Sequence, residues 1–262
     1  MNGIGAHMIE TLFGLKGKTA LITGSSRGIG FTLAGGLARA GASVVLNGRD
    51  GETLAKAVSA LEREGFKACG SLFDVRDERA IQQELKKIEK DRGAVDILIN
   101  NAGVQIRAPL EHFEESDWRR ILDTHLTGAF LTAKAVVPGM ILRKAGKIIN
   151  ICSVQSDLAR PTIAPYTAAK GGLKMLTQGM ATDWGKYNIQ VNGIAPGYFK
   201  TAMTRKLYED KTFDAWLRAR TPANRWGDPD ELIGAAVFLA SRASDYVNGH
   251  VLFVDGGLRA CV

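Results

Sequence analysis

The chain has 262 residues, of which 45% are hydrophobic and 23% are charged, and it carries a formal net charge of +7. This length and composition suit one large α/β domain, and the dispersed glycines and few prolines leave no candidate linker or low-complexity segment. The 34 basic residues are spread among 27 acidic ones and form no basic run interleaved with aromatics, which argues against a nucleic-acid-binding protein.

The N-terminal half alternates between apolar segments and helical patterns. Residues 1–14 carry no motif, and we expect an N-terminal extension there that need not be ordered. Continuous apolar strands separated by helices of ordinary length predict a βαβαβ arrangement. We therefore predict a three-layer, Rossmann-like α/β fold with a doubly wound parallel sheet, in a single catalytic domain over 15–262. The strand-like segments of this half are 19–23, 43–47, 67–73 and 95–100.

A glycine-rich turn, Thr23-Gly24-Ser25-Ser26-Arg27-Gly28-Ile29-Gly30, joins the first predicted strand to a helix that begins near Gly28. Its glycines allow a tight turn and let the backbone approach a pyrophosphate, which can sit at the positive N-terminus of the helix. The spacing Gly-x-x-x-Gly-x-Gly differs from the more common Gly-x-Gly-x-x-Gly, and a plain tight connection is the alternative. The residues that we expect to bind a dinucleotide here are Gly24, Ser26, Arg27, Gly28, Ile29 and Gly30.

The end of the second predicted strand, Leu46-Asn47-Gly48-Arg49-Asp50, lies where such a site distinguishes a ribose 2′-hydroxyl from a 2′-phosphate. Gly48 at the tip brings no negative charge, and Arg49 and Arg27 can pair with a phosphate, so NADP is favoured over NAD. A shift of two residues would instead make Asp50 the ribose ligand and NAD the cofactor. An ordinary solvated turn is the remaining interpretation of Arg49.

Two short motifs follow the third and fourth predicted strands. Asp74 could accept a hydrogen bond from the adenine amino group, or it could cap the next helix. Small and polar residues, Asn100-Asn101-Ala102-Gly103, stand where the sheet edge must meet the cofactor. We assign five of these residues to the cofactor site: Asp74, Val75, Asn101, Ala102 and Gly103.

Three side chains in the middle of the chain have the spacing of a hydride-transfer site. Ser153 ends a buried-strand pattern over 147–153, and Pro165 marks the first turn of a helix that carries Tyr166 and Lys170 as i,i+4 neighbours. A lysine ammonium near a phenol favours the phenolate, so the tyrosine can exchange a proton well below its ordinary pKa of about 10. Tyr-x-x-x-Lys alone is common on surface helices, and only the surrounding motifs favour catalysis.

The last third of the chain carries a sixth predicted strand over 190–195, followed by Pro196-Gly197-Tyr198-Phe199-Lys200-Thr201. This segment forms a turn and can then close over a nicotinamide. A further helix begins at Asp228-Pro229-Asp230-Glu231, with a cap, an N1 proline and first-turn acids, and a final strand runs over 250–254. From the turn we assign four residues to the cofactor site: Pro196, Gly197, Phe199 and Thr201.

From about residue 15 to the C-terminus, these ordered motifs resemble the short-chain dehydrogenase/reductase family. The resemblance implies a single Rossmann-like domain of about seven parallel strands, assembled as a homotetramer. It implies that Ser153 polarises the substrate carbonyl and that Tyr166 exchanges the proton. It also implies that Lys170 binds the nicotinamide ribose, in addition to lowering the pKa of the tyrosine.

One position departs from the family pattern. Members usually carry an asparagine in Asn-x-x-Gly, which supports a water chain to the lysine, whereas this chain has His125-Leu126-Thr127-Gly128. We include His125 among the catalytic candidates, because an imidazole can replace the hydrogen bonds of the asparagine and relay protons near neutral pH. A packed histidine without a catalytic part is the alternative.

For the substrate, the stretches 143–204 and 220–229 look like those of family members that interconvert D-gluconate and 5-keto-D-gluconate. Loop cations, Lys200 among them, border the cofactor end of the sheet and could hold a sugar carboxylate, and Gln105 and Ser156 could bind hydroxyls. The alternatives are a 3-oxoacyl-carrier-protein reductase, another polyol or sugar dehydrogenase, or, from a different class, a non-catalytic NADP-binding regulatory protein. The residues that we assign to a sugar-acid substrate are Arg107, Gln155, Arg160 and Tyr198.

The sequence also bears on location. Its longest apolar runs are far shorter than a membrane span, and the N-terminus lacks the pattern of a signal peptide. Cys69, Cys152 and Cys261 form neither a disulfide framework nor a Cys-x-x-Cys motif, which fits a reducing compartment. We therefore expect a cytoplasmic enzyme without a membrane partner, and without a metal because the histidines show no ligand spacing.

Overall fold

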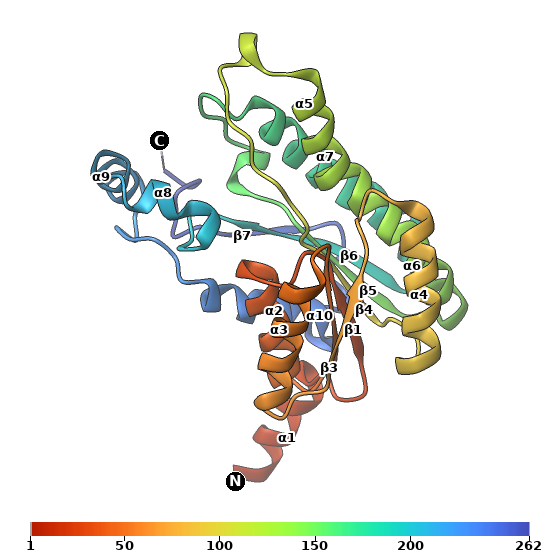
Figure 1. The fold of residues 1–262 in the computed structure, drawn as a ribbon. Helices are drawn as coiled ribbons and strands as arrows, with labels where there is room; N and C mark the ends of the chain where they lie inside the picture. Colours follow the sequence, from red (N-terminus) through yellow and green to blue (C-terminus); the bar gives the residue numbers. More distant parts are fainter. Residues whose placement is uncertain (1, 262) are drawn as a thin grey trace.

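The fold is known from a computed structural model that describes the backbone of residues 2–261 and the side chains of residues 8–261. Within these residues, seven strands form one parallel sheet in the order β3-β2-β1-β4-β5-β6-β7 (Figure 1). The predicted Rossmann-like doubly wound sheet is therefore confirmed. The strands are β1 (Thr19–Ile22), β2 (Ser43–Gly48), β3 (Ala68–Leu72), β4 (Ile97–Asn100), β5 (Gly146–Ile151), β6 (Ile189–Pro196) and β7 (Val251–Val254).

Helices cover both faces of the sheet (Figure 1). One face carries α2 (Gly28–Arg39), α3 (Gly51–Arg63) and α10 (Ile233–Ala240), and the other carries α4 (Glu78–Arg92), α6 (Gly128–Arg143) and α7 (Ala164–Trp184). The expected N-terminal extension forms a helix, α1 (Asn2–Phe13), except for Met1, which lies outside the described residues. The remaining helices are α5 (Glu115–Leu122), which leads through the π-helical turn η2 (Asp123–Thr127) into α6, and α8 (Arg205–Tyr208) and α9 (Lys211–Arg220), which stand beyond the sheet near the C-terminus.

The sheet separates two buried cores. Neighbouring residues of one strand belong to different cores: Ile22 and Ile99 pack beneath α2, whereas Leu21 and Leu98 pack beneath α4 and α6. This follows from strand geometry, since successive side chains point to opposite faces. Both faces are buried, which explains why the strands are apolar throughout instead of alternating.

The sheet order creates the crevice in which a ligand can bind. β1 pairs with β2 on one side, where Ile22 is opposite Leu46, and with β4 on the other, where Ile22 is opposite Ile99. The chain therefore winds outward in opposite directions from β1. In sheets of this kind, ligands bind outside the carboxyl ends of the strands at that reversal point.

Strand boundaries differ from the predicted ones by at most two residues. β5 ends at Ile151, although the apolar pattern continues to Ser153. The reason is that Ser153 starts a 3-10 turn, η3 (Val154–Ser156), in which its Oγ accepts a hydrogen bond from Gln155 N at 3.1 Å. The predicted N-cap at Asp228 is confirmed: it forms a capping box with Glu231 at the start of η6 (Pro229–Leu232), which leads into α10.

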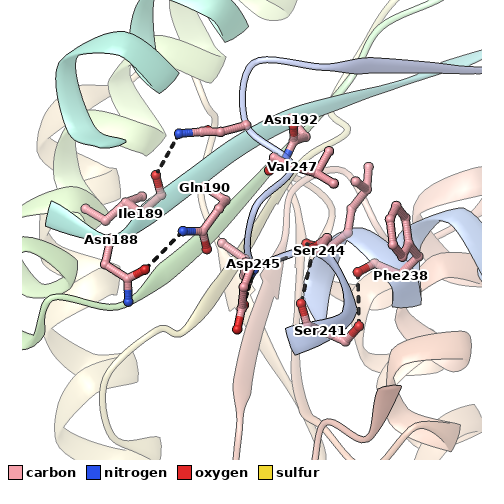
Figure 2. A network of polar contacts seen from close by, with 12 residues as sticks. Asn188, Ile189, Gln190, Asn192, Phe238, Ser241, Ser244, Asp245 and Val247 are labelled. Carbon is pink, nitrogen blue, oxygen red and sulfur yellow. Dashed lines mark hydrogen bonds and ion pairs between the residues drawn. The ribbon is translucent and has the colours of Figure 1, made fainter. Parts of the chain in front are cut away.

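A buried polar network fixes the loop that joins α10 to β7 (Figure 2). Asn192 of β6 donates through Nδ2 to Val247 O at 2.7 Å and accepts from His250 N at 3.0 Å. In the 3-10 turn η7 (Arg242–Ser244), Ser244 Oγ donates to Ser241 O at 3.1 Å. Asn192 is only 1% exposed, so these bonds satisfy polar atoms that would be costly to bury unpaired.

The helical stretch Glu115–Arg143 is long enough to span a membrane, and its most apolar 18-residue window has a mean hydropathy of 1.3. Polar residues divide this stretch into short apolar runs, so the sequence shows no single apolar run of that length. Its α6 part lies against the sheet, whereas α5 extends beyond it, and 44% of the most apolar 18-residue window is buried. A helix that packs in the core of an α/β protein can have the same length and hydropathy as a membrane span.

Candidate active site

The turn between β1 and α2 forms an open cradle at the crevice. Gly28 has a φ of +60°, and no described atom lies within 4 Å of the position that a β-carbon would take there. Arg27, at the N-cap position of α2, makes no side-chain capping bond. The first N–H groups of the helix therefore remain available, next to space that a phosphate can fill.

The cradle is tied to the carboxyl end of β4. A β-carbon on Gly30 would lie 2.4 Å from Asn101 Nδ2, so only glycine fits. Asn101 Nδ2 donates to Thr23 O at 2.9 Å and to Gly24 O at 3.0 Å. Thr23 Oγ1 accepts from the backbone N–H groups of Asn101 and Ala102, at 3.0 and 3.1 Å. The structure thus brings together the two cofactor motifs, which lie far apart in the sequence.

Asn47 supports the same turn, and the sequence analysis did not select it. It is 2% exposed, and its Oδ1 accepts from Gly24 N at 3.0 Å. Its Nδ2 donates to Ser71 O at 3.2 Å and to Phe73 O at 3.0 Å, so one side chain joins the ends of β1, β2 and β3. A polar residue at the end of an apolar strand is the pattern that could have indicated it.

The end of β2 has the register expected for a 2′-phosphate site. Gly48 is its last residue, and a β-carbon there would lie 3.3 Å from Ser26 Oγ. Asp50 is the N-cap of α3 and accepts from Thr53 N at 2.8 Å; its bonds with Thr53 lower its pKa. Asp50 is therefore engaged in a helix cap. Arg49 is about half exposed.

Asp74, after β3, is bound by arginine side chains. Arg76 donates to both carboxylate oxygens, and this pairing is the main reason that the pKa of Asp74 is lowered to about 2. The alternative that Asp74 caps the next helix is wrong, because Asp77 caps α4. Val75 is buried against Gly128, so that only its backbone can reach a ligand.

Ser153, Tyr166 and Lys170 meet at the carboxyl end of β5. Tyr166 and Lys170 lie one turn apart on α7, and Lys170 Nζ is 5.7 Å from the centre of the Tyr166 ring. Tyr166 shares a hydrogen bond with Ser153, whereas Lys170 Nζ donates to Ile151 O. A proton donor and a hydroxyl are therefore adjacent beside the nucleotide cradle.

Burial controls the protonation of this group. It raises the pKa of Tyr166 to about 12, against a smaller opposite effect of the bond with Ser153. Burial also lowers the pKa of Lys170 to about 8. The expected lowering of the tyrosine pKa by Lys170 is not found in this structure, because desolvation outweighs it and the ammonium bonds to the Ile151 carbonyl. At neutral pH Tyr166 is therefore a neutral phenol, ready to donate a proton.

His125 lies in the π-helical turn η2, directly against the tyrosine. Its ring meets the Tyr166 ring edge-on, with centroids 5.2 Å apart. Its Nε2 lies 2.7 Å from Val104 O and 3.0 Å from Val104 N, while Nδ1 has no hydrogen-bond partner among the described residues. Burial, followed by the charge of Lys170, lowers its pKa to about 3. The imidazole is therefore neutral, and the expected proton relay near neutral pH is not supported.

The four predicted substrate residues also lie together. Burial raises the pKa of Tyr198. It outweighs three opposite effects, which come from the charges of Arg160 and Arg107 and from the side chain of Gln155. Burial lowers the pKa of Arg107, and the charge of Arg160 lowers it further. Within the described part of the chain, neither guanidinium forms an ion pair. Two adjacent cations beside Tyr198, without an acidic partner among the described residues, provide a site for an anion.

Of the other polar residues considered for the substrate, Ser156 and Lys200 interact with other parts of the protein, whereas Gln105 keeps a buried Oε1 without a partner among the described residues. Ser156 Oγ donates to Lys170 O at 2.9 Å, and the charge of Lys200 acts on the carboxylate of Asp214. An aromatic cluster that the sequence analysis did not select surrounds Tyr198 instead; it consists of Tyr208, Phe213, Trp216 and Trp226.

In the segment after β6, the side chains of Phe199 and Thr201 pack within the protein, so this segment can offer a cofactor mainly its backbone. Phe199 is 4% exposed and packs in the core, against Gly227. Thr201 caps the 3-10 turn η5 (Ala202–Thr204) through a reciprocal pair with Thr204. These contacts position Pro196 and Gly197 at the end of β6, and they leave the Phe199 ring unavailable to a cofactor.

Comparison with known proteins fits this geometry. Residues 18–212 match the family model described as short chain dehydrogenase. The chain is 59% identical to gluconate 5-dehydrogenase of Gluconobacter oxydans (strain 621H), over 94% of this chain and 96% of that protein. It is 55% identical to 5-keto-D-gluconate 5-reductase of Escherichia coli (strain K12), over 97% and 100%. A crystal structure of a gluconate 5-dehydrogenase from Burkholderia cenocepacia J2315, in complex with NADP and tartrate, superposes with a TM-score of 0.94 at 55% identity, over 97% of this chain and 99% of that one.

Proposed function

We propose, since the chain belongs to the short-chain dehydrogenase family, that it is an NADP-dependent oxidoreductase interconverting D-gluconate and 5-keto-D-gluconate. One observation carries the proposal. A half-buried phenol, Tyr166, interacts with the hydroxyl of Ser153 and with Tyr198, and the cations Arg107 and Arg160 act on that same Tyr198. A polyol held at its carboxylate would thereby present a hydroxyl to the phenol oxygen.

The residues of the nucleotide cradle fit NADP. The open position at Gly28 leaves room for a pyrophosphate, and Arg49 supplies an exposed cation where the 2′-phosphate would lie. Asp50, the acid that could have favoured NAD, is held in the α3 cap. The bound cofactor would supply the acceptor or the donor of a hydride.

The catalytic residues have separate tasks in this proposal. During oxidation, the substrate C–H bond breaks as a hydride departs and the hydroxyl proton passes to the ionised oxygen of Tyr166. During reduction, the neutral phenol returns that proton to the carbonyl oxygen. Ser153 donates a hydrogen bond to the same oxygen and stabilises its developing charge. Lys170 supplies a nearby positive charge that favours the ionised tyrosine when it forms.

The substrate carboxylate would bind to Arg107 and Arg160, which approach Tyr198 from two different loops. Arg160 is itself held over the Phe213 ring, with Cζ 5.1 Å from the ring centroid. A rigid pair of guanidiniums suits a carboxylate, and Gln155 adds a polar group for a hydroxyl. The thioester group of a 3-oxoacyl-carrier-protein substrate carries no charge for this pair, whereas the carboxylate of a sugar acid does, and this favours the sugar acid.

We also propose that the protein acts in the cytoplasm as a homotetramer. Its three cysteines, all within the described residues, are free thiols, as expected for a reducing compartment. The outward sides of α6 and α7 expose apolar side chains, including Phe130 and Met175. Such unpaired apolar helix faces suit contact with further copies of the chain.

The test is to follow NADPH formation with D-gluconate and with a panel of other aldonates, alcohols and acyl thioesters. D-gluconate should be the best substrate, and NADP should be used in preference to NAD. Tyr166→Phe should reduce kcat by about 10²- to 10⁴-fold, since it removes the acid/base, while leaving NADPH binding intact. Cofactor binding without turnover on any substrate would exclude the enzymatic proposal in favour of a regulatory protein.

A further inference from the structure

We infer that Arg76 sets the preference for a 2′-phosphate by neutralising Asp74, an inference that rests on the proposed use of NADP. Arg76 was not among the predicted site residues. It follows the Asp74-Val75 pair beyond the end of β3, beside the end of β2 that carries Arg49. It is a positioning residue here, because it acts through the carboxylate that faces Arg49 and need not touch the cofactor.

Arg76 and Arg49 share Asp74 unequally. Arg76 Nη2 donates to Oδ2 at 2.7 Å, its Nε lies 3.1 Å from Oδ1 and 3.2 Å from Oδ2, and its backbone N–H donates to Oδ1 at 3.0 Å. Arg49 Nη1 is 3.5 Å from Oδ2, and Arg49 forms no hydrogen bond with a described residue. A two-point guanidinium pair satisfies the carboxylate. The Arg49 guanidinium therefore remains available to pair with an anionic ligand.

The charges around Arg49 explain why the pairing of Asp74 with Arg76 affects phosphate binding. Arg27 approaches from the glycine turn, and its charge reaches Asp50, which is itself engaged in the α3 cap. Without Arg76, Asp74 would be the closest unpaired anion to Arg49. It would draw Arg49 to itself and repel an incoming phosphate. A ribose 2′-hydroxyl carries no charge, so binding of NAD would change far less.

A pair of ligands isolates this effect without turnover. Adenosine 2′,5′-bisphosphate and 5′-AMP differ only by the 2′-phosphate, so the ratio of their affinities, measured by calorimetry at fixed ionic strength, reports its recognition. The wild-type protein should prefer the bisphosphate. Arg76→Ala should reduce that preference by about three- to tenfold, as expected for partly screened charges, with little change for 5′-AMP.

Two further variants make the test specific. Arg79→Ala removes the same charge three residues away, where no ion pair is found among the described residues, and should alter both affinities by less than about twofold. In the double variant Asp74→Asn with Arg76→Ala, the unpaired anion is gone, so the preference for the bisphosphate should return. Thermal melting of each variant shows whether it is folded, which is expected because Arg76 is exposed at the surface.

The outcomes separate this inference from the proposed function. Loss of the preference in Arg76→Ala together with its recovery in the double variant supports the inference. Loss in both variants would mean that Arg76 binds the phosphate itself, and an equal weakening of both ligands would mean a structural role. Either result, or an unchanged preference in Arg76→Ala, overturns the inference while NADP use stands. A wild-type protein without any preference would overturn the assignment of NADP and this inference with it.

Discussion

The phenol of Tyr166 carries a proton at neutral pH, because burial raises its pKa to about 12. Oxidation needs the ionised oxygen, whereas reduction needs the phenol. We therefore expect the rate of gluconate oxidation to rise with pH from 7 to 10, by up to about tenfold per unit. The rate of 5-keto-D-gluconate reduction should stay level up to about pH 7 and fall around pH 8, where half of Lys170 has lost its proton. Initial rates in both directions, at saturating cofactor, test this; an oxidation rate that is level below pH 9 would contradict it.

His125 offers a second test at the scale of one side chain. Its Nε2 is bound by the Val104 backbone, and its ring fills the space beside Gly103, where a β-carbon would lie 2.4 Å from Cε1. We expect His125→Ala to lose about 2–4 kcal/mol of unfolding free energy, from a cavity and an unpaired backbone group. It should also lower kcat, because Tyr166 loses its edge contact. Urea unfolding and steady-state rates measure both effects.

The matched control for that variant is His125→Asn. An asparagine amide can donate to Val104 O and accept from Val104 N, so this variant should recover most of the activity lost in His125→Ala. The pH–rate profile between 6 and 8 should be the same in all three proteins, since the imidazole does not titrate there. An inflection near pH 6.5 in the wild type that disappears in His125→Asn would instead establish a proton relay.

The residue types of this site could be predicted from the sequence, but not their ionisation. The spacing of Tyr166 and Lys170 on one helix indicated the pair, yet spacing does not report burial, and burial reverses the expected direction of the tyrosine pKa. The same limit applies to His125, where the neighbouring backbone of Val104 decides its role. Asn47 was missed because its partners come from three different strand ends.

At the scale of elements, the β1–α2 turn depends on open space as well as on backbone conformation. Gly28 and Gly17 both have positive φ, +60° and +80°, and a β-carbon at either position would meet no described atom within 4 Å. Alanine at each should therefore cost a similar amount, about 1–2 kcal/mol, from left-handed strain. Only Gly28→Ala places a methyl group in the cradle. We expect it alone to weaken NADPH binding, measured by nucleotide fluorescence; equal weakening by Gly17→Ala would contradict the cradle.

The elements themselves were largely predictable from the sequence. Apolar runs identify parallel strands because both faces are buried, and the strand order follows from the doubly wound pattern. The family resemblance is confirmed as well, since a family model matches residues 18–212. The π-helical turn η2 was not predictable, because its residues continue an ordinary helical pattern between α5 and α6. The cluster around Tyr198 was also missed, since aromatic spacing in α9 does not show what the helix packs against.

At the scale of the whole molecule, α6 and α7 expose apolar side chains that a second copy of the chain can cover. α6 and α7 are adjacent. Leu126, in the turn η2 that precedes α6, contacts α7 at Gly172. Phe130 is 43% exposed on α6 and Met175 is 61% exposed on α7. Because isolated exposed apolar side chains are common, these fractions gain meaning only if a second copy packs on both helices.

A homotetramer would have four times the 28.2 kDa mass of one chain, which light scattering after size exclusion can measure directly. Phe130→Glu with Met175→Glu should reduce that mass, because burying two carboxylates at a copy-to-copy contact costs far more than the contact gains. Leu72→Glu serves as the control: Leu72 is 51% exposed, but it lies on the edge strand β3, away from both helices. The control should keep the wild-type mass. A double variant that also keeps it would show that α6 and α7 are not the assembly surface, and a wild-type mass of one chain would exclude the tetramer.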